Sequence, residues 1–339
     1  MVRRRAVWMF AAAIVLGAAV LASSSHAADK PPFRNAGKYG AMFSWWYEAL
    51  PPQTLYPPAM PWDARDQKWW TSIVRQATDA GLGWLSAACW GEGSPADPAM
   101  LAPLLRAIDV NGGRMKVALF DDTTSEVLRK NQERHGEWVL SPRFDLADTN
   151  EQGEGGFRYF YQEQWRRFFA TVPDKYRLKI NGRPVIFMWI GFDGWYTNLT
   201  SFHALIQDLR EATRREFGVD PFVIAEESWR RLDPALQPDA LYDWFEPQRN
   251  WATLVEFGGI HVANIVPGYD TTPLGTPSAV LDRQRGALFR AGMDAVAPRA
   301  DLVLIEGFVN VDENAHLVET TTWGRLYLNI LRWYARNIP

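Results

Sequence analysis

Cysteine is almost missing from this chain, because Cys89 is the only one among 339 residues. A single cysteine cannot form an internal disulfide, and the apolar run around Cys89 predicts a core residue rather than a nucleophile. The chain also contains no G-x-S-x-G, P-loop, G-x-G-x-x-G or H-E-x-x-H pattern. The sequence therefore does not support a serine hydrolase, a nucleotide-binding protein or a zinc protease.

Histidine is scarce as well. Beyond residue 28 the chain contains only His135, His203, His261 and His316, each far from the next. Single, widely spaced histidines do not predict a shared metal site, so we expect neither a metal nor a cofactor. A Ca²⁺ ion bound by loop carboxylates stays open at this stage.

Long apolar runs are confined to the N-terminus. Arg3, Arg4 and Arg5 precede an apolar run over residues 6–22, and small residues continue to Ala27. This order predicts a secretory signal peptide over residues 1–28, cleaved near Ala27, with an uncleaved N-terminal anchor as the alternative. No later run is long enough to cross a bilayer. We therefore expect a secreted or periplasmic protein with no stable membrane insertion after cleavage.

An excess of positive charge is absent too. The 36 Lys and Arg residues face 39 Asp and Glu residues, and the formal net charge is −3. Removal of residues 1–28 would take away three arginines and make the chain more acidic. This balance argues against a nucleic-acid partner. Residues 29–339 suffice for one barrel-sized domain, and the oligomeric state stays open.

Tryptophan, by contrast, is abundant, with 17 residues. A tryptophan exposed in a cleft offers a flat apolar face to the C–H face of a sugar, whereas a buried one needs a partner for its N–H group. Packing in the core is the alternative for each of them. The aromatic residues at expected strand ends that we assign to sugar binding are Trp46, Tyr47, Trp90, Trp189, Trp229 and Tyr269.

Strand and helix patterns alternate along the chain, which is typical of a parallel sheet. The patterns predict an α/β protein, a single-domain (β/α)8 TIM barrel with extended βα loops. Residues 123–156 interrupt the regularity, and a polar stretch of this length is usually functional or partly helical. The expected strands cover residues 39–47, 82–90, 115–120, 185–190, 222–225, 240–245, 262–266 and 302–305. The expected helices cover residues 66–80, 98–110, 157–170, 201–217, 279–297 and 322–337.

Acids gather where these strands end, which is the end at which barrel enzymes do their chemistry. The clearest example is residues 301–320, where an apolar run turns abruptly into acids and amides; an ordinary surface loop is the alternative. Glycoside hydrolysis needs one carboxyl group to protonate the leaving oxygen and another to support an oxocarbenium-like centre. A nearby apolar ring raises the pKa of the acid. The candidate catalytic residues are Glu313, Asp122, Glu226, Glu227 and Glu306, and further candidates for substrate binding are Glu92, Asp121, Glu246 and Asn310.

Several short motifs occur in one order along residues 39–319. They are Asp63-Ala64-Arg65-Asp66 before a helix that ends in Gly81-Leu82-Gly83, Trp90-Gly91-x-Gly93-x-x-x-Asp97, Lys116-Val117-Ala118 with Asp121-Asp122, Lys179-Ile180-Asn181-Gly182-Arg183-Pro184-Val185, and Pro267-Gly268-Tyr269-Asp270. In this order they resemble glycoside hydrolase family 99, the endo-α-mannosidase and endo-α-mannanase barrels, and the related family 71. The resemblance implies a TIM barrel that acts on glycosidic bonds.

The resemblance also implies roles for residues after the last strand. The family carries Asn-Glu-Trp-x-Glu-Gly there, and its two glutamates act as general base and general acid. Aligned on Phe308, the second glutamate falls on Glu313 and the first on Asn310, while the family's glutamate after the third strand falls on Asp122. An amide cannot take up a proton. Glu313 is therefore the expected general acid, with the second carboxylate from strand ends 3, 5 or 8.

These observations favour a secreted or periplasmic glycoside hydrolase that acts within a polysaccharide. The alternative is a barrel that binds a cell-surface glycan without cleaving it, which Asn310 favours. A transglycosylase or lyase would differ mainly in the acceptor. A carboxyl partner about 5 to 10 Å from Glu313 across an open cleft would support hydrolysis.

Overall fold

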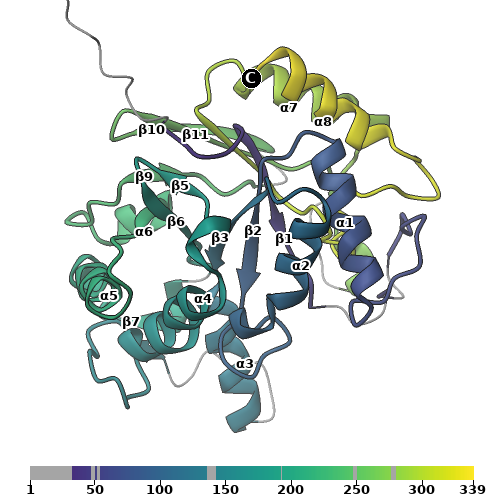
Figure 1. Ribbon diagram of the computed structural model, residues 1–339. Coiled ribbons are helices and arrows are strands. Elements are labelled where there is room, and N and C mark those ends of the chain that lie inside the picture. Colours follow the sequence, from purple (N-terminus) through teal and green to yellow (C-terminus); the bar gives the residue numbers. More distant parts are fainter. Residues whose placement is uncertain are drawn as a thin grey trace, which may run out of the picture. The chain divides into compact units, whose positions relative to one another are not determined.

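The computed structural model describes residues 33–46, 50–51, 54–135, 143–191, 193–246, 250–275 and 280–339 (Figure 1). The predicted signal peptide, residues 1–28, and the predicted sugar-binding residue Tyr47 lie outside these ranges. No helix within these ranges is long and apolar enough to span a membrane.

Eight parallel strands form the centre of the fold, and they lie in the order β11-β14-β1-β2-β3-β6-β8-β9. The first and last of them along the chain are neighbours, with Ala41 opposite Ile305. An antiparallel strand, β10, pairs with β11 and lies beside β9, so the sheet is nearly closed. The predicted TIM barrel is confirmed. The parallel strands are β1 (Tyr39–Phe43), β2 (Trp84–Cys89), β3 (Lys116–Asp121), β6 (Arg183–Met188), β8 (Phe222–Glu226), β9 (Ala240–Tyr242), β11 (Ile260–Ile265) and β14 (Leu302–Ile305), and β10 is Ala252–Phe257.

Helices cover the outside of this sheet, as α1 and α2 do beside β1 and β2 in Figure 1. Helix α1 begins where the Asp66 carboxylate accepts a hydrogen bond from the Lys68 N–H, and its Trp69, Ile73 and Ala77 are buried. This is the usual chemistry of a helix start and of an amphipathic face. The α-helices are α1 (Gln67–Asp79), α2 (Ala102–Val110), α3 (Thr123–His135), α4 (Arg166–Thr171), α5 (Phe202–Phe217), α6 (Glu227–Leu232), α7 (Ala287–Val296) and α8 (Leu326–Asn337). Short extra strands are β4 (Phe144–Asp145), β5 (Lys179–Ile180), β7 (Tyr196–Thr197), β12 (Tyr269–Asp270) and β13 (Val280–Leu281).

Some predicted helices differ from the observed ones. Residues 157–170 form a π-helix, Arg158–Trp165, that continues into α4. Its Tyr159, Phe160 and Tyr161 are all buried, so this helix packs against the rest of the protein on more than one face. The helix expected from residue 279 begins only at Ala287, after residues 285 and 286 with positive φ. The last helix starts at Leu326, and the irregular stretch from residue 123 opens with α3.

Side chains from alternate strand positions fill the barrel interior, where Trp84 stacks on Phe187 with ring centroids 5.5 Å apart. Gly40 lies against the same indole, and a Cβ atom there would come within 2.0 Å of the ring. A glycine at this point of β1 therefore makes room for the tryptophan in the interior layer. The other strand faces pack against the helices, and Cys89 is buried in that layer, as predicted.

Candidate active site

A cleft of about 390 Å³ opens where the parallel strands end. We call it the strand-end cleft. Its polar lining comes chiefly from the segments that follow β3 and β14. The polar residues in its wall are Asp122, Ser125, Glu306, Asn310, Asp312 and Glu313, and the aromatic residues are Trp46, Trp90, Phe120, Trp189, Trp244, Phe245 and Tyr269.

One amide joins two of the acids. The Asn310 Nδ2 atom donates a hydrogen bond of 2.8 Å to Glu306 Oε1 and another of 2.6 Å to Glu313 Oε2. The Tyr269 hydroxyl donates to Glu313 Oε1 at 3.1 Å. Because a single nitrogen reaches both carboxylates, their oxygens are no further apart than the roughly 5–5.5 Å typical of retaining glycosidases. Asn310 is therefore a bridge between two acids of the site.

Burial controls the charge of these two acids. It raises the pKa of Glu313 to about 7, and nearby Asp312 adds to the rise, while bonds from Asn310 and Tyr269 oppose it. The pKa of Glu306, which is fully buried, is raised well above its usual value by burial and by the charge of Glu313. Burial therefore favours the protonated form of Glu306, and Glu313 is poised between its two forms near neutral pH.

Asp122 follows β3 and begins helix α3. Trp90 Nε1 donates to its Oδ2 atom at 2.9 Å and Ser125 Oγ at 2.8 Å, while the Ser125 N–H donates to Oδ1 at 3.1 Å. Burial raises the pKa of Asp122 to about 7, and these donors oppose the rise. Three donors favour the ionised carboxylate, so this acid is suited to accept charge or a proton.

Tryptophan rings form the cleft walls in pairs. Trp46 and Trp90 have ring centroids 4.3 Å apart, and Trp189 and Trp244 have centroids 5.7 Å apart. These rings and Tyr269 lie in the same cleft as Glu313, which places flat apolar faces beside a titrating acid. The predicted association of Trp46, Trp90, Trp189, Tyr269 and Asn310 with Glu313 and Asp122 is observed.

Other predicted site residues lie elsewhere. Trp229 is fully buried and stacks on Phe202 with centroids 3.7 Å apart, so it is a core residue and its prediction as a sugar platform is wrong. Asp121 is also fully buried, where it accepts hydrogen bonds from Trp165 Nε1 at 2.7 Å and from Thr123. These bonds hold the end of β3 in place, and Asp121 does not line the cleft.

Three further acids are outside the cleft as well. The Glu226 carboxylate caps α6 by accepting from the Ser228 N–H at 3.1 Å. Glu227 points to another surface hollow and pairs with Arg231 at 3.7 Å, and Glu246 is exposed. Glu226 thus caps a helix, and Glu227 lies at the surface. Their positions do not support the prediction that Glu226 or Glu227 acts in the cleft.

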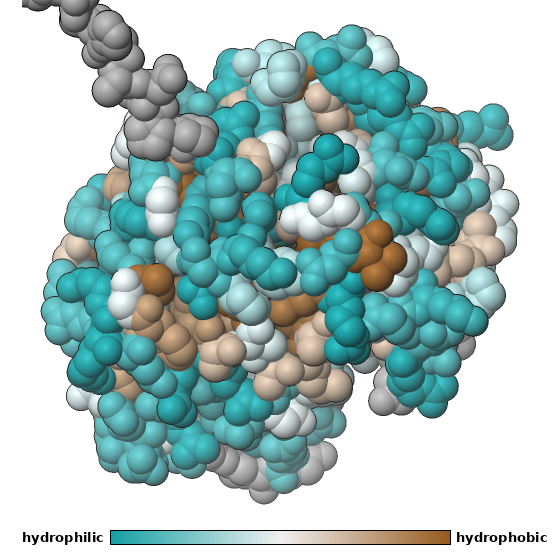
Figure 2. Space-filling model, viewed as in Figure 1, coloured by the Kyte–Doolittle hydropathy of each residue, from teal (hydrophilic) through white to brown (hydrophobic). Residues whose placement is uncertain are grey.

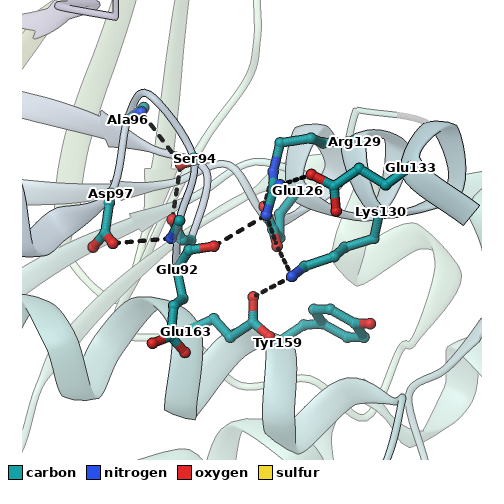
Figure 3. A network of polar contacts seen from close by, with 12 residues as sticks. Glu92, Ser94, Ala96, Asp97, Glu126, Arg129, Lys130, Glu133, Tyr159 and Glu163 are labelled. Atoms are coloured by element: carbon teal, nitrogen blue, oxygen red, sulfur yellow. Dashed lines mark hydrogen bonds and ion pairs between the residues drawn. The ribbon is translucent and has the colours of Figure 1, made fainter.

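Glu92 belongs to a separate charged network (Figure 3). Its side chain pairs with Arg167 at 3.0 Å and faces a groove of about 600 Å³ beside the π-helix. Its backbone carbonyl accepts from Arg129 Nη2 at 3.0 Å, which attaches the Trp90 loop to α3. The contribution of Glu92 is therefore to loop position rather than to the cleft wall.

Seven described residues of the cleft wall were not among the predicted site residues: Met42, Ala88, Phe120, Ser125, Trp244, Phe245 and Asp312. The spacing of Asp122 and Ser125 is that of a helix cap, and this signal would have identified Ser125 had the helix after β3 been recognised.

His316 is buried, and burial lowers its pKa to about 3. Its Nε2 atom lies 2.8 Å from the Tyr56 carbonyl oxygen. Within the described ranges, no three His, Cys, Asp or Glu side chains are grouped to hold a metal ion.

Comparison with known proteins identifies the family. The sequence matches the family described as a domain of unknown function, DUF5010, over residues 22–339. The chain belongs to this family. A comparison of the DUF5010 chain with curated proteins finds no match.

Solved structures share the fold of this DUF5010 domain at low sequence identity. The GH99 endo-alpha-mannosidase of Bacteroides thetaiotaomicron in complex with BIS-TRIS-propane is 15% identical, with 89% of this chain and 97% of that chain covered and a TM-score of 0.59. Another structure of that enzyme is 14% identical with the same coverage and a TM-score of 0.56. A glycoside hydrolase-like protein is 15% identical, with 88% and 93% covered and a TM-score of 0.62. The resemblance to family 99 is thus confirmed at the level of the fold.

Proposed function

We propose that this protein is a glycoside hydrolase that cleaves within a polysaccharide, with Glu313 as general acid and Asp122 as the second carboxylate. The main support is that both carboxyl groups line one aromatic-walled cleft at the strand ends and that burial raises the pKa of each to about 7. Groups that titrate near neutral pH serve well in general acid–base catalysis. The family 99 fold agrees with this proposal.

The hydrogen bonds divide the roles. Ionisation of Glu313 is disfavoured first by burial and then by the neighbouring Asp312, so Glu313 is the better proton donor to the leaving oxygen. Asp122 receives three hydrogen bonds that favour its anion, so it can stabilise the oxocarbenium-like centre or activate the attacking group. One protonated and one ionised carboxyl group is the state that glycoside hydrolysis requires.

Glu306 is a further acid of the cleft, but its place argues for a supporting role. Its side chain is fully buried, and the Asn310 amide stands between it and Glu313. It can orient Asn310 by accepting the hydrogen bond from its Nδ2 atom. The two tryptophan pairs provide more than one sugar platform, which supports action on a polymer.

A second candidate function is binding of a glycan without cleavage. Asn310 favours it, because the resemblance to family 99 aligns this amide with that family's base, and an amide cannot accept a proton. Both candidates use the same aromatic walls, so only product formation separates them.

The test is a panel of polysaccharides incubated with the purified chain, with detection of new reducing ends and of product lengths. Hydrolysis is expected for at least one polymer, and Glu313→Gln and Asp122→Asn should each lower kcat by about 100-fold or more. Glu227→Gln is the matched control, since Glu227 lies outside the cleft. Full activity of Glu313→Gln on a polymer that the wild type cleaves would refute the assignment. Binding without any product would favour the second candidate.

We also propose that the protein is secreted or periplasmic, which the basic, apolar and small-residue order of residues 1–28 supports. Expression of the full chain in a secreting bacterial host, followed by mass measurement, is expected to give a chain that begins near Asp29. A chain that retains its first residues and stays in the membrane fraction would contradict this.

A further inference from the structure

Two buried oxygens near Glu313 have no hydrogen-bond partner within the described ranges. They are Glu306 Oε2 and Asn310 Oδ1, and these residues are 0% and 3% exposed. Polar groups at the surface are satisfied by water, and the face of the protein seen in Figure 2 is mainly hydrophilic. An oxygen that is shut off both from water and from donors is costly, so these two oxygens need a physical explanation.

The remaining polar atoms of the same two groups are already joined. Asn310 Nδ2 donates to Glu306 Oε1 at 2.8 Å. If Glu306 were ionised, Oε2 and Oδ1 would both be acceptors and could not satisfy each other. A proton on Oε2 makes that oxygen a donor, and a planar amide can join a planar carboxylic acid through two antiparallel hydrogen bonds. One proton thus accounts for both oxygens.

The surroundings of Glu306 favour that proton. Burial raises the pKa of Glu306 well above its usual value, and the charges of Glu313 and Asp312 add to the rise. The bond that Oε1 accepts and the charge of Arg283 oppose it. Tyr269 also feels the charge of Glu306, but its hydroxyl group donates to Glu313. Removal from water is the largest of these effects, and it favours the neutral acid.

We infer that Glu306 is a neutral carboxylic acid that donates from Oε2 to Asn310 Oδ1, and that this pairing fixes the direction of the Asn310 amide. With Oδ1 and one N–H held by Glu306, the second N–H of Nδ2 is directed at Glu313 Oε2, where the bond is 2.6 Å. A reversed amide would place an acceptor against Glu313 and disfavour its anion. Glu306 is therefore a positioning residue that acts on Glu313 through Asn310. Its effect on catalysis rests on the proposed function, whereas the pairing itself does not.

The proton can be observed without a substrate. The infrared spectrum of the wild type minus that of Glu306→Gln at pH 7 is expected to contain the carbonyl band of one protonated carboxylic acid. Neutron diffraction from a deuterated crystal is expected to show a deuteron on Glu306 Oε2 that points to Asn310 Oδ1. Carboxylate bands in place of the acid band, or a deuteron directed elsewhere, would overturn the inference.

Glu306→Gln and Glu306→Leu are matched variants of similar size. Glutamine keeps an oxygen that can accept from Asn310 Nδ2 and gains an N–H group that can donate to Oδ1, whereas leucine leaves this side of the amide unpaired. At pH 7 the equilibrium constant for urea unfolding should rise about tenfold or more in Glu306→Leu and by less than about threefold in Glu306→Gln. Equal losses would overturn the inference. If Glu306→Leu does not fold, the infrared comparison of the wild type with Glu306→Gln still decides.

The functional test follows Glu313 through the basic limb of the kcat/KM profile on a cleaved polymer. Without the directed N–H, Glu306→Leu should move this limb to higher pH and lower kcat severalfold, and Glu306→Gln should recover most of that loss. If Glu306 were an anion, Glu306→Gln would remove a like charge and move the limb to lower pH, which would contradict the inference.

Glu227→Gln is the control, since Glu227 lies outside the cleft. Failure of the wild type to cleave any polymer would count against the hydrolase alone, because the infrared, diffraction and unfolding measurements need no substrate. Cleavage of a polymer together with an ionised Glu306 would support the hydrolase and overturn the inference.

Discussion

The indole nitrogen of Trp90 donates a 2.9 Å hydrogen bond to Asp122, so one side chain both forms a cleft wall and tunes a carboxyl group. The ring lies against Trp46 at 4.3 Å. Trp90 leaves the end of β2 and Asp122 the end of β3, two neighbouring strands of the barrel. This bond connects the binding surface to the charge of the proposed catalytic group.

Trp90→Phe keeps an aromatic face and removes this donor. The pKa of Asp122 is then expected to rise further, because the donor favours the anion. If Asp122 acts ionised, the acidic limb of the kcat/KM profile moves to higher pH by about half a pH unit or more. The measurement is a pH–rate profile on a cleaved polysaccharide. Trp189→Phe serves as the control, and an unmoved limb in Trp90→Phe would contradict the role of Asp122.

Glu126→Gln tests a buried acid outside the cleft. Glu126 is fully buried, burial raises its pKa to about 9, the nearby Glu163 adds to the rise, and a bond from Arg129 opposes it (Figure 3). A carboxyl group whose pKa is higher in the folded state stabilises the fold most at low pH. That stability is lost as the pH rises from about 4.5, the pKa of the group in the unfolded chain, toward about 9, its pKa in the folded protein.

The side chain of the variant cannot ionise at residue 126. Between pH 5.5 and pH 8.5 the unfolding free energy of the variant should therefore fall by about 1 to 3 kcal/mol less than that of the wild type. Urea unfolding at both pH values measures this difference. Glu133→Gln on the same helix, whose more exposed carboxylate also pairs with Arg129, should keep the wild-type slope. An unchanged slope in Glu126→Gln would show that this acid is ionised throughout.

Arg283→Met tests the support of the segment after β14, residues 306–316, which carries Glu306, Asn310 and Glu313. The guanidinium donates to the Asn314 carbonyl at 2.9 and 3.1 Å and to the His316 carbonyl at 2.5 Å. Loss of these bonds leaves buried carbonyl groups unpaired, so the unfolding free energy should drop by about 2 to 4 kcal/mol. Proteolysis within residues 310–316 should accelerate, with a larger fall in kcat than rise in KM.

Arg283→Lys should lie between the wild type and Arg283→Met, because an ammonium cannot bond both carbonyl groups with the fork geometry of arginine. Arg299→Met is the control, since its side chain donates to the Ala295 carbonyl oxygen at the end of α7. Wild-type stability of Arg283→Met would mean that the loop holds its shape without this side chain.

Substitutions of two tryptophans should distinguish a core residue, Trp229, from a residue of the cleft wall, Trp46. Trp229→Phe should lower the unfolding free energy by about 1 to 2 kcal/mol and leave glycan affinity unchanged, because the ring packs on Phe202. Trp46→Ala should weaken glycan binding severalfold, because its ring lines the cleft. Chemical unfolding and calorimetric titration measure the two effects. A loss of affinity in Trp229→Phe would restore the prediction that this residue contacts sugar.

Strands were predictable because burial on both faces leaves an unmistakable apolar run. The strand over residues 302–305 has the predicted bounds, and the alternation of strands and helices predicted the barrel. Helix α3 was not predicted, because its sequence is almost entirely polar and has no apolar stripe. The segment before α7 differs because positive φ values at residues 285 and 286 interrupt the helix.

The candidate site was predictable only in part, since position at a strand end does not specify the direction of a side chain. Trp229 and Trp90 both follow strands, yet one is buried against α5 and the other lines the cleft. Glu226 is the last residue of β8 and Asp122 directly follows β3, yet of these two only Asp122 reaches the cleft.

Local chemistry written in the chain determined where strands, helices and the clusters of acids and tryptophans occur. The tertiary structure decided which of these side chains meet, as Asp121 and Asp122 show. They are adjacent and identical in type, but successive residues of a strand point to opposite faces. Asp121 therefore accepts a hydrogen bond from the buried Trp165. Asp122 lies in the cleft, where burial and the hydrogen bond from Trp90 act on its pKa in opposite directions.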